Sequence, residues 1–233
     1  MDPRLVDAPR SALSATEPAS TSGGRELLAL ADWRRRVADL FSEVRSVATD
    51  DPEQGWERWR AGRDELFRSH PQSPVPEAER AGFVGRYFEY DPSLRFERVP
   101  VEPAPPPAPN ALPLTLPNSG DDALAFHRIG SLEIGLPAGP RRLSLFWMEG
   151  YAGGLFLPFR DVTNGDRTYA AGRYLLDTAK SGDLGGDLLA GTLVVDFNFA
   201  YQPSCAFDPR WACPLAPPEN RLDIPIEAGE RIA

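Results

Sequence analysis

The amino-acid sequence predicts a mainly β protein of the α+β class: an antiparallel β-barrel or sandwich-like body preceded by an N-terminal helical hairpin. Two patterns lead to this fold class. Apolar residues recur at helical spacing up to residue 72, and from residue 73 onward short apolar segments alternate with turn residues. Many short strands without intervening helices are typical of an antiparallel sheet. The chain has 233 residues, 42% of them hydrophobic, so it is long enough to bury such a core.

The helical hairpin is expected over residues 25–72. An apolar stripe with steps of three and four residues predicts a first helix over 25–48. A second helix is expected to begin with Asp51 as its N-cap, since a proline follows and Gln54 stands three residues later, and to end at His70. Only about two residues separate the helices, which favours an antiparallel pair packed on the barrel.

The β-barrel-like domain is expected to span residues 73–233. Turn residues divide it into candidate strands whose inward-facing residues would form the core. Within it, residues 99–117 are rich in proline and predict a stiff extended connector. The candidate strands are 83–90, 94–101, 112–116, 123–136, 141–149, 154–161, 167–177, 189–201 and 222–227.

Charge and composition restrict the partners. The formal net charge of −9 argues against a nucleic acid or an anionic membrane as partner. Residues 1–24, rich in Ala, Ser, Pro and Thr, are predicted to be a disordered tail and do not resemble a secretory signal. No apolar run approaches the roughly 20 residues that span a bilayer. A cytoplasmic location with reduced thiols is therefore expected, and a homodimer is left open.

Residues 156–229 combine a high density of Arg, Asp, Asn and Tyr side chains with both cysteines. Alternation along the predicted strand 189–201 places Phe197 on the core face and puts Asp196 and Asn198 together on the opposite face. Polar groups near a core are costly unless they are paired. This density therefore predicts a site or a locked turn.

Two arginines are the main candidate ligand-binding groups. Tyr169 and Arg173 would share a face of the predicted strand 167–177, and the small Ala171 between them leaves room for a ligand or a neighbouring strand. Arg160 and Arg173 would then form a receptor for a planar anion such as a carboxylate or phosphate. The alternative is structural, because a network of Arg, Asp, Tyr and Asn can satisfy strand edges and turn backbones.

Cys205 and Cys213 are the only two cysteines, and their separation differs from the close Cys-x-x-Cys pairs of zinc sites. Only His70 and His127 could supplement them, so neither a metal nor a cofactor is expected. A loop-closing disulfide or two buried thiols is the favoured interpretation. A nucleophilic Cys205 is the alternative if it faces the arginines, because cations lower a thiol pKa.

Ordered motifs along the chain resemble one known family. They are W-R-x-x-RDELF-x-x-H-P-x-SP from Trp59, PFRD-x-T-x-G-x-x-TY-x-x-GRYL from Pro158, DFN-x-AY-x-P-x-CAF from Asp196, CPL-x-PPENRL from Cys213 and I-x-AGE from Ile226. Together they are similar to the prokaryotic domain of unknown function family 1684. Alanines at 170–171 replace expected glycines, and Gln202 replaces an expected Asn.

The resemblance implies that the motif residues act as one constellation, and it names no substrate. The members of this constellation are Arg160, Asp161, Thr168, Tyr169, Gly172, Arg173, Asp196, Asn198, Tyr201, Cys205, Cys213 and Asn220.

We expect a small-molecule site at the mouth or in the interior of the barrel. Asp196 is the candidate general base, and Tyr169 and Tyr201 are candidate catalytic hydroxyl donors. The expected chemistry is metal-independent acid–base catalysis on an anionic or carbonyl-containing substrate. The alternative is a non-catalytic ligand-binding or interaction module whose polar network is structural. The candidate ligand-binding residues are Arg160, Asp161, Thr168, Arg173, Asn198 and Cys205.

Overall fold

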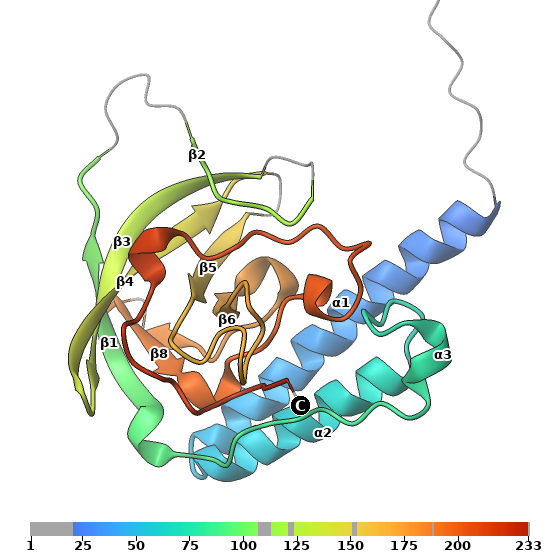
Figure 1. Ribbon diagram of the computed structural model, residues 1–233, viewed down its shortest axis with the longest axis horizontal. Helices are drawn as coiled ribbons and strands as arrows, with labels where there is room; N and C mark the ends of the chain where they lie inside the picture. The colour runs from blue at the N-terminus through green and yellow to red at the C-terminus, as the bar shows by residue number, and fades with distance from the viewer. Residues whose placement is uncertain (1–20, 107–112, 121–123, 151–152, 188, 233) are drawn as a thin grey trace, which may run out of the picture.

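The protein folds as a curled antiparallel sheet with a helical hairpin across its open side, as Figure 1 shows. The computed structural model describes residues 21–106, 113–120, 124–150, 153–187 and 189–232. Within these ranges the sheet is an open half-barrel, and the expected mainly β, α+β class is confirmed. None of the helices in the described ranges is long and apolar enough to cross a membrane.

Helices α1 (Thr21–Ala48) and α2 (Pro52–Ser69) form the expected hairpin. The Asp51 side chain accepts a hydrogen bond from the backbone N–H of Gln54 (3.0 Å), and this bond caps α2 as the sequence predicts. Helix α1 begins within the tail that was expected to be disordered, and residues 1–20 lie outside the described residues.

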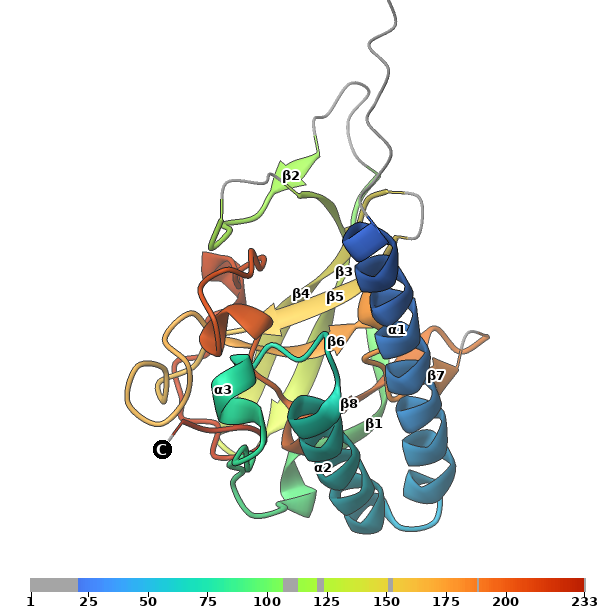
Figure 2. The same ribbon diagram turned by 90° about the vertical axis from the view of Figure 1, so that its right-hand side faces the viewer.

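Aromatic side chains of the hairpin pack against aromatic residues from the second half of the chain. The ring of Trp59 lies 5.2 Å from that of Phe199, and the ring of Phe67 lies 5.2 Å from that of Phe207. Figure 2 shows both helices on the same side of the sheet. After α2 the chain turns at His70 and forms the short helix α3 (Glu77–Arg80) before it enters the sheet.

The sheet has the strand order β6-β5-β4-β3-β1-β8-β7, and β2 pairs with β3. The first half of β1 pairs with β8 and the second half with β3, so β1 joins the two parts of the sheet. All strand pairs are antiparallel. The strands are β1 Arg95–Pro103, β2 Leu114–Thr115, β3 Ala125–Leu136, β4 Gly139–Met148, β5 Gly154–Phe159, β6 Arg173–Asp177, β7 Gly186–Asp187 and β8 Thr192–Asp196.

Two expected strands do not form. Residues 83–90 make a single isolated bridge to Glu230 and are otherwise irregular. Residues 222–227 are also irregular, because a side chain takes the place of a neighbouring strand: the Asp161 carboxylate accepts a hydrogen bond from the N–H of Ile226 (2.6 Å). A side-chain partner satisfies that donor as well as a strand ladder would.

Two further strands are shorter than expected. Strand β6 begins at Arg173 rather than at residue 167, because the preceding residues form a tight turn. Strand β8 ends at Asp196 and continues as a 3-10 helix, η3 (Phe197–Phe199). The strand alternation stops there, so the expected separation of Phe197 and Asn198 onto opposite faces is wrong, and both are fully buried.

The proline-rich stretch is partly strand. Residues 99–103 belong to β1 and residues 114–115 form β2, so the expected connector over 99–117 is wrong at both ends. Pro100 stands opposite Thr192 in the ladder of β1 with β8. The middle of the stretch, 107–112, lies outside the described residues.

Three apolar clusters hold these elements together. The first fills the inside of the curled sheet and includes Leu132, Leu157 and Phe197. The second lies between the helical hairpin and the segment after β6, with Trp59 at its centre. The third contains aromatic rings of β3, β4, β5 and β6, and the ring of Phe156 contacts those of Phe126 and Tyr174.

Candidate functional site

Arg173 and Asp161 lie at the centre of the motif region and are fully buried. Arg173 Nη2 is 3.4 Å from Asp161 Oδ2. The same guanidinium donates to the carbonyl oxygens of Ile226 (2.9 Å), Ala228 and Glu230 (3.2 Å). Burial lowers the pKa of Arg173 to about 10, although the nearby carboxylates favour its charged form. This guanidinium therefore ties the C-terminal I-x-AGE segment to the start of β6.

Thr168 belongs to a turn that closes on Asp161. The Thr163 hydroxyl donates to the Asp161 carboxylate (2.8 Å) and lies 2.8 Å from the Thr168 hydroxyl. The Asn164 side-chain amide donates to the Thr168 hydroxyl oxygen (2.8 Å). Local side-chain bonds of this kind are typical of turn-forming Asp, Asn and Thr residues. The D-x-T-x-G-x-x-T motif thus holds its own turn together.

Arg160 lies at the edge of the same turn. Its Nη2 donates to the carbonyl oxygen of Ala170 (2.8 Å) on an exposed side of the turn, whereas the guanidinium of Arg173 is buried. Neither arginine lines any of the cavities described below. A shared anion receptor formed by Arg160 and Arg173 stays a prediction.

Asn220 of the CPL-x-PPENRL motif is buried between two strands of the sheet. Its side-chain amide donates to the carbonyl oxygens of Ser144 (2.9 Å) and Pro158 (2.7 Å), and its Oδ1 accepts from the N–H of Ser144 (2.7 Å). One side chain therefore satisfies three backbone groups of β4 and β5. Asn220 anchors the C-terminal segment to the sheet.

Asp196 is buried and occupied by structural partners. Its Oδ1 accepts from the backbone N–H (2.9 Å) and the side-chain amide (2.8 Å) of Asn198. Its Oδ2 is 3.1 Å from Nη1 of Arg95. Asn198 in turn pairs through both amide atoms with the backbone of Asp91 (2.8 Å each). Burial raises the pKa of Asp196, as a general base would need, but both carboxylate oxygens are engaged.

Tyr169 and the two cysteines form a separate cluster. The Tyr169 hydroxyl donates to the Cys205 sulfur (3.6 Å), and both cysteines are free. Burial raises the pKa of Tyr169 to about 12. The structure has two free thiols, a half-buried one at Cys205 and a buried one at Cys213.

Tyr201 faces a small cavity between the helical hairpin and the sheet. The cavity has a volume of about 80 Å³, and its wall includes Trp59, Arg63 and Tyr174. It is smaller than the roughly 300–1,000 Å³ of typical ligand pockets. Arg63 pairs there with the buried Glu230 (2.8 Å), and its guanidinium lies 5.1 Å from the centre of the Tyr201 ring. Burial raises the pKa of Tyr201.

The expected site residues therefore fall into separate groups. The structure brings Asp161, Thr168 and Arg173 together, it joins Asp196 to Asn198, and it joins Tyr169 to Cys205. The Arg160 side chain bonds to the turn from its exposed side, and Tyr201 lies at the small cavity. No cavity described here contains residues of more than one group. The catalytic and ligand-binding roles expected of these residues stay predictions.

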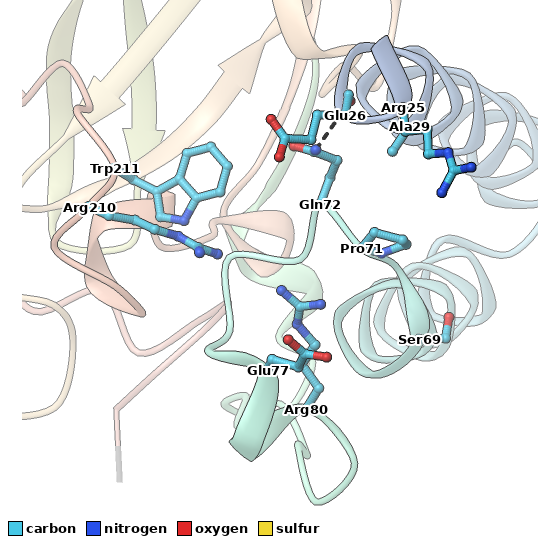
Figure 3. A pocket seen from close by; sticks show the side chains of 10 residues that line it. All are labelled: Arg25, Glu26, Ala29, Ser69, Pro71, Gln72, Glu77, Arg80, Arg210 and Trp211. Atoms are coloured by element: carbon cyan, nitrogen blue, oxygen red, sulfur yellow. Dashed lines mark hydrogen bonds between the residues drawn. The ribbon is translucent and has the colours of Figure 1, made fainter. Parts of the chain in front are cut away.

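A larger cavity lies elsewhere, and we call it the arginine groove. It has a volume of about 840 Å³ and opens between the start of α1, the segment 69–80 and the turn that carries Arg210 and Trp211, as Figure 3 shows. Its lining contains three arginines and two glutamates in a chain of net charge −9. The lining residues are Arg25, Glu26, Ala29, Ser69, Pro71, Gln72, Glu77, Arg80, Arg210 and Trp211.

Two guanidinium groups converge in the arginine groove. Arg80 Nη2 and Arg210 Nη2 both donate to the carbonyl oxygen of the buried Ser73, each at 3.4 Å. Arg210 also pairs with Asp208 (3.2 Å). Among the described residues, Arg80 has only backbone carbonyl partners, at Val75 (2.9 Å) and Ser73. Because both guanidinium groups share the single carbonyl oxygen of Ser73, some of their N–H donors can still bind an anion.

The H-P-x-SP motif contributes Pro71 and Gln72 to the lining of this groove. The Ser73 hydroxyl donates to the carbonyl oxygen of Phe67 (2.7 Å), and His70 Nδ1 accepts from the N–H of Gln72 (3.0 Å). These bonds fix the turn after α2 and aim the Ser73 carbonyl at the arginines. The motif was visible in the sequence, but its partner Arg210 lies far away in the chain and gave no signal of its own.

No three His, Cys, Asp or Glu side chains gather as a metal site would require in the part of the chain that the structure describes. His70 is buried beside Asp32 (3.3 Å), and His127 pairs with Glu149 on the sheet. The two histidines and the two cysteines thus lie in different surroundings.

The fold and these networks define a class of protein: a half-barrel sheet closed by a helical hairpin, with an irregular C-terminal segment anchored by buried polar side chains. Residues 83–231 match the family model described as "Protein of unknown function (DUF1684)", and the chain belongs to this family. The resemblance of its motifs is thereby confirmed, although the motif from Trp59 lies before the matched residues.

A solved structure has the same fold. It is the solution NMR structure of an uncharacterized protein from gene locus rrnAC0354 of Haloarcula marismortui, with 33% sequence identity and a TM-score of 0.56. The similarity covers 79% of this chain and 96% of that chain. A search of the curated proteins found no match.

Proposed function

We propose that the protein binds a small anionic molecule in the arginine groove. The observation that carries this proposal is the convergence of Arg80 and Arg210 on the carbonyl oxygen of Ser73. Guanidinium groups present paired N–H donors that match a carboxylate or phosphate, and such charge-assisted bonds are stronger than neutral ones. Asp208 already pairs with Arg210, so an anion that bridges the two arginines would chiefly compensate the charge of Arg80.

The size and walls of the groove suit a molecule of moderate size. A volume of about 840 Å³ falls within the range of small-molecule sites. The guanidinium of Arg210 lies 5.2 Å from the centre of the Trp211 ring, so this ring offers an apolar wall beside the positive charge. Glu26 and Glu77, which also line the groove, favour a ligand that carries a hydrogen-bond donor besides its negative charge.

Catalysis is a second candidate function. Acid–base chemistry by Asp196, Tyr169 and Tyr201 on an anionic or carbonyl-containing substrate stays a prediction, and none of the three lines the arginine groove. The raised pKa of Asp196 favours this role. The non-catalytic alternative gains support from the many structural bonds of the motif residues. Ligand binding in the groove is compatible with both.

Binding is tested by calorimetric titration with inorganic phosphate, citrate and a benzoate as probes. We expect at least one of them to bind, and we expect Arg80→Ala and Arg210→Ala each to weaken that binding by tenfold or more. The reason is that a hydrogen bond to a charged group contributes ~1.5–3 kcal/mol, and 1.4 kcal/mol corresponds to a factor of ten.

The matched control is Arg58→Ala, which removes an exposed arginine from the outer side of α2 where it pairs with Glu43. Its affinity for the probe should equal that of the natural protein. Failure of all three anions to bind contradicts the proposal, as does unchanged affinity in the Arg80→Ala, Arg210→Ala double variant. Melting temperatures of all variants establish that each one is folded.

A further inference from the structure

A second cavity lies at the opposite end of α1 from the arginine groove, and we call it the bulge pocket. It has a volume of about 350 Å³, within the range of small-molecule sites, and lies between the end of α1 and the strands β1, β7 and β8. Arg25 lines the groove and Arg45 lines the bulge pocket, so the two sites are about 30 Å apart along the helix. An inference about the bulge pocket therefore does not depend on the groove.

Strand β1 brings a strained arginine to the wall of the bulge pocket. The register of β1 with β8 shifts between Phe96 and Val99, where two residues of β1 stand opposite one residue of β8. Arg98 lies in this β-bulge and has φ +54°, a left-handed conformation that favours glycine. Bulges re-aim side chains, and strained residues of this kind gather at ligand sites. The strain thus falls on a residue that lines a cavity.

Two arginines of the lining have no carboxylate partner in the described parts of the chain. Arg45 is half-buried, and its Nη1 donates to the carbonyl oxygen of Asp183 (2.9 Å). Arg98 is exposed and has neither a hydrogen bond nor an ion pair within the described ranges. Both guanidinium groups therefore keep N–H donors that a bound anion could use.

The remaining charges of the lining leave a surplus of positive charge. Arg95 pairs with Asp196 (3.1 Å) and with Glu97 (3.2 Å), so these three groups compensate one another. Asp187 is the other carboxylate, and its Oδ1 accepts from two backbone N–H groups of the turn that follows (2.9 and 3.1 Å). Arg45 and Arg98 outnumber it in a chain of net charge −9.

Thr192 of β8 adds a polar group to the same wall. Its hydroxyl oxygen is buried and has no hydrogen-bond partner among the described residues. A buried polar atom without a partner is costly, and a bound water, ion or ligand is the usual way to satisfy it.

We propose that the bulge pocket binds a compact, hydroxylated phosphate monoester, with Arg45 and Arg98 holding the phosphate group. A phosphate group offers three strong acceptor oxygens, enough for two guanidinium groups and a hydroxyl, whereas a carboxylate offers two oxygens. Asp187 is an acceptor only, so it favours a ligand whose organic part carries a hydroxyl donor.

The experiment is a calorimetric titration of the full-length chain with glycerol 3-phosphate as the probe. The starting protein carries Arg80→Ala and Arg210→Ala, so that the groove is silenced. We expect this double variant to bind the probe, and we expect a further Arg98→Gly or Arg45→Ala change to weaken that binding by tenfold or more, because each removes charge-assisted hydrogen bonds.

Arg98→Gly should also raise the melting temperature of the ligand-free protein, by ~2–4 °C, because glycine adopts a positive φ without steric cost. A loss of binding combined with a gain of stability indicates a residue that is strained for function. The matched control is Ser181→Gly, which relieves the positive φ of a residue outside the bulge pocket (φ +65°). It should raise the melting temperature as well and leave the affinity unchanged.

Three outcomes would overturn the proposal. They are no binding of glycerol 3-phosphate to the groove double variant, an affinity that Arg98→Gly leaves unchanged, and an equal loss of affinity in Ser181→Gly. If the natural protein binds the probe and the folded double variant does not, the groove is the site of binding and the bulge pocket is not. The two proposals therefore fail separately, and melting temperatures establish that each variant is folded.

Discussion

Arg173 and Asp161 form an ion pair in which neither side chain has any exposure to solvent. Arg173 opens β6, and Asp161 follows β5, so the pair joins the ends of two neighbouring strands. Each partner also bonds to the backbone of the C-terminal segment at Ile226. Arg173 and Asp161, which were expected to bind a ligand, thus supply hydrogen-bond partners to residues 222–227, where the expected strand does not form.

Replacing Arg173 by Met should strongly destabilise the fold. The variant leaves Asp161 buried without its charge partner and leaves carbonyl oxygens unpaired, and breaking a buried pair in this way costs about 3–5 kcal/mol. Urea denaturation followed by circular dichroism measures this loss. Arg58→Ala is the control, because the exposed ion pair of Arg58 with Glu43 should contribute little to the free energy of unfolding. A stability of Arg173→Met equal to that of the control would contradict the anchoring role.

Asn220→Ala should also destabilise the protein, by roughly 1–3 kcal/mol or more. The backbone N–H of Ser144 and two carbonyl oxygens would lose their partner in a buried place, and an unsatisfied buried group carries its full desolvation cost. Glu219→Ala changes the neighbouring exposed residue and should have no measurable effect. Thermal unfolding distinguishes them, because 1 kcal/mol shifts the melting temperature by ~2–4 °C at this size. Equal melting temperatures would refute the anchor.

Gly229→Ala tests the backbone of the I-x-AGE motif. Gly229 has φ +76°, and an added Cβ would collide with the carbonyl oxygen of Ala200. The strain of that conformation alone costs about 1–3 kcal/mol. Gly135→Ala in β3 is the matched control, because its Cβ would point into open space. Chemical denaturation should show a clear loss for Gly229→Ala only, and parallel losses in both variants would mean that strain is not the cause.

The reactivity of Cys205 should depend on pH with a midpoint of about 6. Its pKa is lowered, so the thiolate is present above that pH and the alkylation rate should fall as the pH drops through 6. The Tyr169 hydroxyl donates a hydrogen bond to the Cys205 sulfur (3.6 Å), which favours the thiolate. Iodoacetamide alkylation followed by mass spectrometry gives the profile for each cysteine separately.

Tyr169→Phe should move that midpoint upward, because it removes one hydrogen-bond donor to the thiolate. Tyr90→Phe changes a tyrosine that packs on Trp56 at the other end of the hairpin and should leave the midpoint in place. A midpoint near 9 in the natural protein, or an identical midpoint in both variants, would contradict this account.

The hairpin and the long strands were predictable because their signals are local. The cap at Asp51 and the apolar stripe of α1 act within a few residues, and both helices form as expected. Strands β3 and β4 follow their apolar patterns closely. The motif resemblance likewise identified the family, since it depends only on the order of residues.

The strand ends were not predictable for a physical reason. Residues 222–227 have the composition of a strand, but their hydrogen bonds go to Asp161 and Arg173, whose positions depend on the folded sheet. Strand β8 likewise stops at Asp196 because its carboxylate caps the 3-10 helix that follows. The strand propensity of a segment depends on its own residues, so it does not show which distant side chain will hydrogen-bond to its backbone.

The sequence by itself determined the fold class, the helices, the family and the inventory of polar groups between residues 156 and 229. Only the tertiary structure decided where those groups face. It buried Arg173 against backbone carbonyls, and it brought Arg80 and Arg210 to the same carbonyl of Ser73. The reason is that helical and strand periodicities are local, whereas the partner of a buried charge is chosen by contacts between segments far apart in the chain.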